Sequence, residues 1–236
     1  MTDLEALRAR IVERGYAFEP AAALRRALGG LPDWEAFAAS WDRLVLDTHL
    51  PEGHRYRRRR HATLSAAAGA RVARREAHAP HYQAREYNRL VGGIERWFEP
   101  VEDVVLEGAT FQRIVGFCLE LFAPLQPRAA WHIECHQFRI EARAEAAGQP
   151  TPEGVHRDGV DYVLVMLVRR ENIASGTTTV HALDDRPLGS FTLAEPLDAA
   201  LVDDSRVKHG VTAVTPVDAT RPAYRDVLVV TLRRKK

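Results

Sequence analysis

The chain has 236 residues, of which 46% are hydrophobic and 28% are charged, a balance that suits a globular protein with a sizeable core. Its 33 lysines and arginines nearly equal its 32 aspartates and glutamates, so no cationic excess is available to drive general binding of nucleic acid. No apolar stretch approaches the roughly 20 residues that span a bilayer, and the acidic start lacks a signal-peptide apolar region, so we expect a cytoplasmic protein without a membrane segment.

The first 50 residues predict a layer of helices. Leu4, Leu7 and Ile11 recur at helical spacing, and Gly15 ends the first helix. The other elements expected in this region are a strand at 16–18, a helix at 21–28 and a helix that begins at 32–33 and carries an apolar stripe to 44. We expect this layer to pack against a sheet and to contribute no chemistry of its own.

The middle of the chain mixes polar segments with one helix. The basic run 55–61 could contact nucleic acid, but because the surrounding charge is balanced we interpret it as a solvated or anion-facing strand. Residues 81–88 are polar and aromatic and do not have the pattern of a core helix. Residues 110–125 do have that pattern, with apolar side chains at helical spacing. Cys118 in this helix and Cys135 in the next strand are expected to be buried free thiols.

From residue 131 onward the pattern is that of strands. Polar and apolar residues alternate along 131–141, and the further strands expected are 161–168, 177–183, 189–193, 200–202, 207–214 and 224–232. No repeat, low-complexity linker or second domain is evident. The sequence therefore predicts one α+β domain over 1–236, mainly β, in which the N-terminal helical layer (1–50) lies in front of a distorted jelly roll built by 131–236.

Three residues have the spacing of a metal site. His156 and Asp158 lie two apart at the mouth of a strand, where they share one face, and His209 begins another strand. Two imidazoles and one carboxylate on one face of an octahedron form the facial triad of non-haem Fe(II) oxygenases. Three positions then stay open, of which a 2-oxo acid can take two and dioxygen the third. We therefore predict His156, Asp158 and His209 as metal ligands.

A dicarboxylate co-substrate also needs a fixed cation in a mostly apolar cavity, and arginine suits this because its planar fork donates two parallel hydrogen bonds. Arg225 opens the apolar strand 224–232, where a cation would be costly without an anion. Arg221 is the alternative, but it precedes Pro222 and is expected in an extended loop.

The other histidines offer no comparable pattern. His181 is expected to be a packed or rim residue of its strand. The remaining ones have no matching partners in the sequence: His49, His54, His61, His78, His81, His132 and His136. A lone His156 would be interpreted as a solvated loop residue, so the prediction depends on the combination of His-x-Asp, the later His209 and Arg225. The alternative from another class is a non-catalytic β-helix that binds a metal or a small ligand.

Several stretches together resemble a known family. They are Tyr82-Gln83 with Tyr87-Asn88 and Gly92-Gly93, His136–Ile140, Val155–Tyr162, Asp203–Thr212 and Arg225–Leu228. In them, from about residue 55 to the C-terminus, the sequence resembles the bacterial 2-oxoglutarate/iron dioxygenases similar to L-isoleucine hydroxylase, which act on free amino acids. The resemblance implies a cupin-like double-stranded β-helix, Fe(II) and 2-oxoglutarate as cofactors, the triad above and Arg225 as the 2-oxoglutarate anchor. At Ser175-Gly176-Thr177 a Gly-Gly pair is expected in relatives, a departure that alters a turn.

The resemblance also implies a small-molecule substrate, a free amino acid or a close relative of one, with dioxygen as co-reactant and no nucleic-acid partner. Gln137 and Arg139, on one face of a strand, are candidate substrate contacts, as are Gln83 and Asn88. Each has a structural alternative: Gln137 and Arg139 could face solvent or form a sheet-edge ion pair, and Asn88 could cap a turn. A hydroxylase of a protein or nucleic acid, with 57–60 as the surface for an anionic partner, is the remaining alternative.

Overall fold

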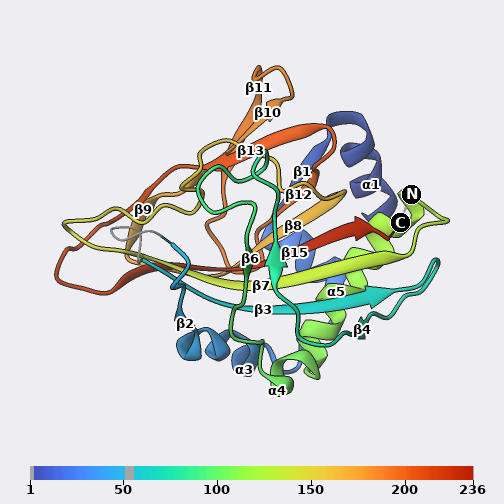
Figure 1. Cartoon of the computed structure of the whole chain (residues 1–236), viewed down its shortest axis with the longest axis horizontal. Coiled ribbons are helices and arrows are strands. Elements are labelled where there is room, and N and C mark those ends of the chain that lie inside the picture. Colours follow the sequence, from blue (N-terminus) through green and yellow to red (C-terminus); the bar gives the residue numbers. More distant parts are fainter. Residues whose placement is uncertain (1–2, 51–55, 236) are drawn as a thin grey trace.

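The main feature of the fold is an antiparallel sheet of eight strands (Figure 1). The structure, a computed structural model, describes residues 3–50 and 56–235, so His54, and Arg55 at the start of the basic run, lie outside the described residues. The main-sheet strands are, across the sheet, β1 (Tyr16–Glu19), β12 (Ala199–Asp203), β8 (Tyr162–Glu171), β15 (Ala223–Arg234), β7 (Trp131–Ala142), β3 (Arg57–Ala66) and β2 (Val45–Leu46), with β4 (Arg74–Arg75) paired to β3.

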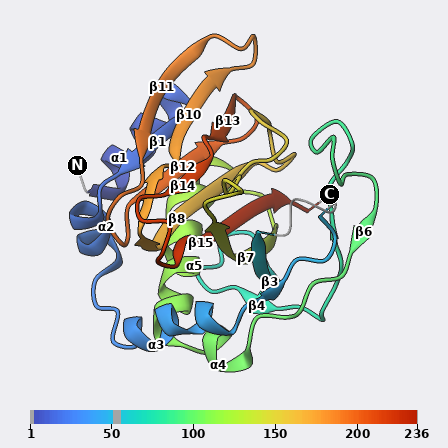
Figure 2. The ribbon, with the colours of Figure 1, turned by 90° about the vertical axis from the view of Figure 1, so that its left-hand side faces the viewer.

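Helices cover one face of this main sheet (Figures 1 and 2). They are α1 (Asp3–Arg14), α2 (Ala21–Leu28), α3 (Trp34–Ala39), α4 (Asp103–Leu106) and α5 (Ala109–Phe122), with two 3-10 turns, η1 (Ser40–Arg43) and η2 (Ala123–Leu125). The core lies between the two layers, where Trp41, Phe111, Phe122 and Trp131 are buried. The predicted helix over 110–125 is confirmed as α5 followed by η2.

The N-terminal segment does more than form helices. It supplies α1, α2 and α3, as predicted, but it also supplies β1 and β2, which are the two ends of the strand order in the main sheet. The helical layer is completed by α5, from the middle of the chain, which contacts α1, α2 and α3. The predicted layer 1–50 is therefore only part of the helical face.

Smaller sheets lie away from the helices. The strands β11 (Pro187–Thr192), β10 (Thr177–Ala182) and β13 (Val207–Val211) form a three-stranded sheet, β9 (Ile173–Ser175) pairs with β14 (Val214–Pro216), and β5 (His81–Tyr82) pairs with β6 (Glu95–Arg96). Figure 2 shows β10, β11 and β13 on the side of the main sheet opposite to α3 and α4. Because β13 carries one predicted ligand, this arrangement brings it over the open face of the main sheet.

Alternation along the strands separates the core from a cavity. In β15, Leu228 and Val230 pack in the core with the helices, whereas Arg225, Val227 and Val229 line a cavity on the other face. The neighbouring strands β7 and β3 alternate in the same way. Side chains that can act on a ligand are therefore those on the face away from the helices.

The basic run forms the first part of β3, inside the main sheet, so its interpretation as a solvated strand is wrong for Arg57 and Arg59, which are buried. The anion-facing interpretation is correct, because Arg57 Nη2 lies 2.7 Å from Asp47 and Arg58 Nε donates to Glu141 over 2.6 Å. These pairings leave the run without the free cationic face that a polyanion would need.

Three further predictions can be assessed here. Cys118 and Cys135 are buried and free, as predicted. Within 3–50 and 56–235, no helix is long and apolar enough to cross a membrane. Ser175 and Gly176 both take positive φ, 63° and 77°, in the turn between β9 and β10, which explains why two glycines would suit it.

Candidate metal centre and co-substrate cavity

A cavity of about 230 Å³ lies on the face of the main sheet opposite to the helices. Its floor is formed by alternate residues of β3, β7, β15 and β8, one wall by β13, and another by the segment that contains β5 and β6. A cavity that is enclosed by strands and bears several ionisable groups is the arrangement expected for a small-molecule site.

The three predicted metal ligands converge in this cavity. The backbones of His156 and His209 exchange two hydrogen bonds of 2.9 Å, which fixes the loop before β8 against β13. Asp158 lies between the two rings, with carboxylate oxygens 3.5 Å from His156 Nε2 and 3.6 Å from His209 Nε2. One ligand atom from each residue lies within 4.8 Å of the others. The spatial arrangement required by the sequence prediction is therefore present.

The donor set fits an Fe(II) ion. His156 Nδ1 lies 3.0 Å from the carbonyl oxygen of Gly154, so Nδ1–H donates to it, and Nε2 is the ring nitrogen that faces Asp158 and would bind a metal. A backbone acceptor that fixes the tautomer in this way is typical of metal-binding histidines. Two imidazole nitrogens and one carboxylate suit a 2-His-1-carboxylate centre with open positions.

The electrostatics of the three residues are strongly coupled. Burial alone would lower the pKa of His156, but the hydrogen bond and charge of Asp158 raise it to about 9. Burial lowers the pKa of His209 to about 4. Burial would raise the pKa of Asp158, yet His156 and His209 hold it well below its usual range. The Asp158 carboxylate thus lies between the His156 imidazole, which holds an extra proton, and the His209 imidazole, which does not. A bound metal cation would replace the extra proton of His156.

Asp204 holds the ligand loop in place and was missed by the sequence analysis, which used this stretch only for His209. Its carboxylate is fully buried and accepts backbone N–H bonds of 2.8 Å from Asp158, 2.8 Å from Gly159 and 3.1 Å from Val160. Burial and the nearby charge of Asp158 raise the pKa of Asp204 to about 7. The sequence does show a carboxylate, Asp204, close to the predicted ligand His209. Only the fold shows that three backbone N–H groups of the ligand loop donate to it.

The segment around β5 closes over the same loop. Gln83 Nε2 donates to the carbonyl oxygen of Asp158 over 3.2 Å, and Asn88 Nδ2 donates to Gln83 Oε1 over 3.1 Å. Gly159 has φ of 79°, and a side chain there would meet the ring of Tyr87 at 2.5 Å. Asn88 Oδ1 also accepts the N–H groups of residues 90 and 91, so its turn-capping role is present. Both predicted residues line the cavity, and their contact with a substrate stays a prediction.

Arg225 is a buried cation of the cavity for which the described residues provide no anion. Only 2% of it is exposed, and Nε and Nη2 have no hydrogen-bond partner in the described part of the chain. Burial lowers its pKa to about 10. Arg221 instead lies at the surface, paired with Glu171 at 3.2 Å. The geometry therefore favours Arg225 over Arg221 as the group that would bind a carboxylate of the co-substrate.

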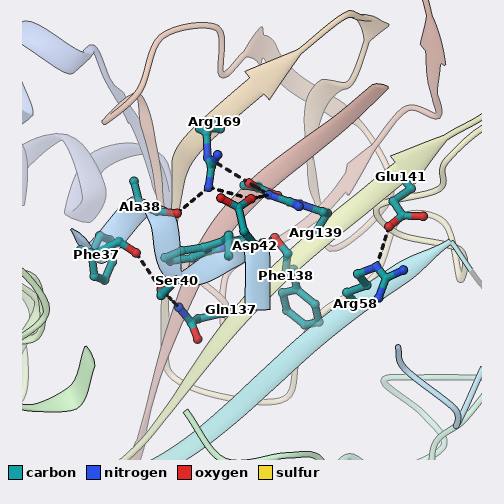
Figure 3. A network of polar contacts seen from close by, with 12 residues as sticks. Phe37, Ala38, Ser40, Asp42, Arg58, Gln137, Phe138, Arg139, Glu141 and Arg169 are labelled. Carbon is teal, nitrogen blue, oxygen red and sulfur yellow. Dashed lines mark hydrogen bonds and ion pairs between the residues drawn. The ribbon is translucent and has the colours of Figure 1, made fainter. Parts of the chain in front are cut away.

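The prediction that Gln137 and Arg139 contact the substrate is wrong, because both lie on the helix-facing side of β7 (Figure 3). Gln137 Nε2 donates to Ser40 Oγ over 2.8 Å. Arg139 donates two 2.7 Å bonds to Asp226 and one 2.8 Å bond to Asp42. These side chains join β7 to η1 and β15, and their polar groups serve the fold.

The histidines that seemed to have no partners form a second cluster. His61, His81, His132 and His136 surround Glu134, and four members of this group, His61, His81, Glu134 and His136, have ligand atoms within 4.8 Å of one another. Glu134, His81, His132 and His136 line the same cavity as the triad. Alternation along β7 places His132, Glu134 and His136 on one face, but His61 joins them only through the register of β3 on β7, and His81 comes from β5 outside the main sheet.

Comparison with known proteins identifies the family. The family model of the 2OG-Fe dioxygenases matches residues 38–231. The chain is 32% identical over 162 residues to L-isoleucine-4-hydroxylase of Bacillus thuringiensis and 24% identical over 160 residues to 3(1)-hydroxy-L-isoleucine 4-dioxygenase of Pantoea ananatis. The Bacillus match covers 66% of this chain and 66% of the relative, and the Pantoea match covers 66% and 65%, so the chain spans just under two thirds of these relatives.

Solved structures agree with this assignment. A bsmA homologue from Methylobium petroleophilum is 35% identical, with a TM-score of 0.88 over 98% of this chain and 92% of that one. The structure of IDO from Bacillus thuringiensis, at 19% identity, shares the fold with a TM-score of 0.80 over 99% of this chain and 100% of that one. The predicted double-stranded β-helix and the predicted resemblance are both confirmed. The chain therefore belongs to the 2OG-Fe dioxygenase family, whose cofactors are Fe(II) and 2-oxoglutarate.

Proposed function

We propose that this protein hydroxylates a free L-amino acid, or a closely related small molecule, with consumption of 2-oxoglutarate and dioxygen and release of succinate and CO2. One observation supports this most directly: His156, Asp158 and His209 converge in a cavity that also contains the unpaired Arg225. Within it, the two imidazoles and the carboxylate would hold Fe(II), and Arg225 would bind the 5-carboxylate of 2-oxoglutarate. The iron and its co-substrate supply the oxygen-insertion chemistry.

The rest of the site orients these groups and limits access to water. Asp204 fixes the backbone of residues 158–160 through three hydrogen bonds, and Gln83 donates to the carbonyl oxygen of Asp158 in the same loop. Val227 and Val229 give the floor an apolar surface between the ionic groups. Such a site keeps the reactive positions fixed and shielded while a small substrate is bound.

The amino-acid substrate class is supported by the relatives, two of which are named for isoleucine or hydroxyisoleucine. The cavity, of about 230 Å³, also suits a small molecule better than a macromolecule. A protein or nucleic-acid hydroxylase is less well supported, because the arginines at 57 and 58 are paired with carboxylates.

The test is a turnover assay with purified protein, Fe(II), 2-oxoglutarate and ascorbate, in which succinate release is measured for each free L-amino acid. We expect one or a few amino acids to stimulate succinate release and to gain roughly 16 Da, the mass of one inserted oxygen atom. Asp158→Ala should abolish turnover, whereas Asp161→Asn, which alters a carboxylate that pairs with Arg234, should not. Full turnover by Asp158→Ala would refute the ligand role, and no response to any amino acid would refute the substrate class.

A further inference from the structure

Glu134 is a cavity-lining carboxylate for which the proposed chemistry has no use. Its side chain is 13% exposed, and its Oε2 lies 2.6 Å from His81 Nδ1, 3.4 Å from His136 Nε2 and 3.8 Å from His61 Nε2. His132 Nε2 lies 3.3 Å from the other oxygen. Register explains the cluster, because β3 places His61 beside His136 on the adjacent strand β7.

The tautomer of His136 shows how the cluster works. Arg59 Nη2 lies 2.7 Å from His136 Nδ1, and a guanidinium can only donate. Nδ1 therefore accepts, so the ring proton is on Nε2, which faces Glu134. A metal ligand would need a lone pair at Nε2, and the positive charge of Arg59 would oppose a cation at that nitrogen. His136 thus acts as a hydrogen-bond donor to the carboxylate, which argues against a second metal site.

Burial favours the neutral form of three of the histidines around Glu134. Burial lowers the pKa of His61 to about 2 and that of His136 to about 3, and burial also lowers the pKa of His81. Burial would raise the pKa of Glu134, but hydrogen bonds from His132, His136 and His81 hold it well below its usual range. The site thus contains a carboxylate anion with imidazole donors, and no lysine or arginine of the described residues lies within ion-pair distance of it. A desolvated anion of this kind favours a cationic ligand.

The same cavity offers the opposite charge. Arg57 is paired with Asp47 at 2.7 Å, and Arg225 is assigned to the co-substrate. Arg96 also lines the cavity, is 2% exposed, and its Nε has no hydrogen-bond partner in the described ranges. A small zwitterion carries both an ammonium group and a carboxylate, so it could satisfy the Glu134 anion and the Arg96 guanidinium at the same time.

We propose that Glu134 is the receptor for the ammonium group of the substrate, held in position by its ring of histidines, and that this contact selects amino acids over analogues without an amine. The inference rests on the proposed function, since it assigns a residue to the amino-acid substrate of the same cavity.

The test compares substrates and variants in the assembled site. The protein, with Mn(II) in place of iron and with 2-oxoglutarate bound, is titrated with the free L-amino acids and with the 2-hydroxy acid that corresponds to the tightest of them. We expect the wild type to prefer the amino acid by about 10- to 100-fold, the usual contribution of a charge-assisted hydrogen bond, and Glu134→Gln to lose this preference. The matched control is Glu141→Gln, on the same strand but on its other face, which should keep the preference.

The outcomes separate the inference from the proposed function. A wild type that binds 2-oxoglutarate but no amino acid refutes the substrate class. Amino-acid binding with an undiminished preference in Glu134→Gln refutes only the role of Glu134. If the Gln variant does not fold, Glu134→Asp keeps the charge and should retain a reduced preference; equal binding of both ligands by Glu134→Asp, or by the wild type, overturns the inference. A second equivalent of metal in the wild type that is absent from Glu134→Gln would assign the cluster to a metal instead.

Discussion

Replacement of Arg225 with methionine should weaken co-substrate binding and stabilise the empty protein. Arg225 is 2% exposed and its Nε and Nη2 lack partners in the described structure, so it is an uncompensated buried charge until a carboxylate arrives. Burial lowers its pKa from 12.5 to about 10, which corresponds to roughly 3 kcal/mol of destabilisation of the charged form, at 1.36 kcal/mol per unit. Methionine has a similar length and no charge, so removal of the guanidinium should stabilise the unliganded fold by about 1–3 kcal/mol.

Binding of 2-oxoglutarate should change in the opposite direction. Two charge-assisted hydrogen bonds are lost, each of which contributes about 1.5–3 kcal/mol, so the Kd should rise by roughly 100- to 10,000-fold. The assays are calorimetric titration of 2-oxoglutarate into the Mn(II)-loaded protein and urea unfolding without co-substrate. The pair of opposite effects is diagnostic, because a purely structural arginine would lower stability when removed.

Arg139→Met provides the matched control, since Arg139 lies on the neighbouring strand but is paired with Asp226 at 2.7 Å. Its removal leaves the buried Asp226 with Arg169, 3.4 Å away, as its remaining cationic partner, and should lower the free energy of unfolding by about 3 kcal/mol, with little change in the Kd for 2-oxoglutarate. The reasoning fails if Arg225→Met binds 2-oxoglutarate as tightly as the wild type, or if both variants lose stability to the same extent.

Two further predictions concern the loop before β8 and the histidine cluster. Asp204→Asn keeps only one oxygen to accept the three backbone N–H groups, so the affinity of the triad for Mn(II) should fall by about 10- to 100-fold. The control variant Asp203→Asn should leave this affinity unchanged. Equal Mn(II) affinities of the two variants in a metal titration would contradict the positioning role of Asp204. His61 and His136 have pKa values of about 2 and 3 in the fold, so the unfolded chain binds protons that the folded chain cannot. Their contribution to stability is complete well above pH 6.5 and should fall by about 3 kcal/mol in total between pH 6.5 and 5. Urea unfolding at several pH values measures this, and the slope should decrease in His61→Gln; a flat profile would count against it.

The sequence was sufficient for the metal centre because its geometry is local. His156 and Asp158 are two residues apart at a strand entry, where the extended backbone places both on one side. His209 lies in the middle of β13, and only the antiparallel bridge between the two histidines, with its two 2.9 Å bonds, had to come from the fold. Arg225 could be chosen over Arg221 because a lone cation in an apolar strand is conspicuous.

The histidine cluster could not be found in this way. Glu134 and His136 are local to β7, but His61 is 75 residues earlier in the chain and reaches them only through the register of β3 on β7. A shift of one residue in that register would turn His61 toward the helices. His81 comes from a two-residue strand outside the main sheet, which has no periodic signal at all.

Gln137 and Arg139 show why polarity alone does not identify a site residue. Alternation along β7 separated two faces correctly, and the more polar pair was assigned to the substrate, yet that face packs against η1 and β15. The helix-facing side of the sheet and its cavity side differ in whether the protein itself provides partners for the buried polar groups. Arg139 has carboxylates from the protein itself, as a structural residue must in a buried position. Arg225, on the cavity face of the next strand, has none among residues 3–50 and 56–235, and this unmet requirement is what distinguishes a residue that binds a ligand from one that supports the fold.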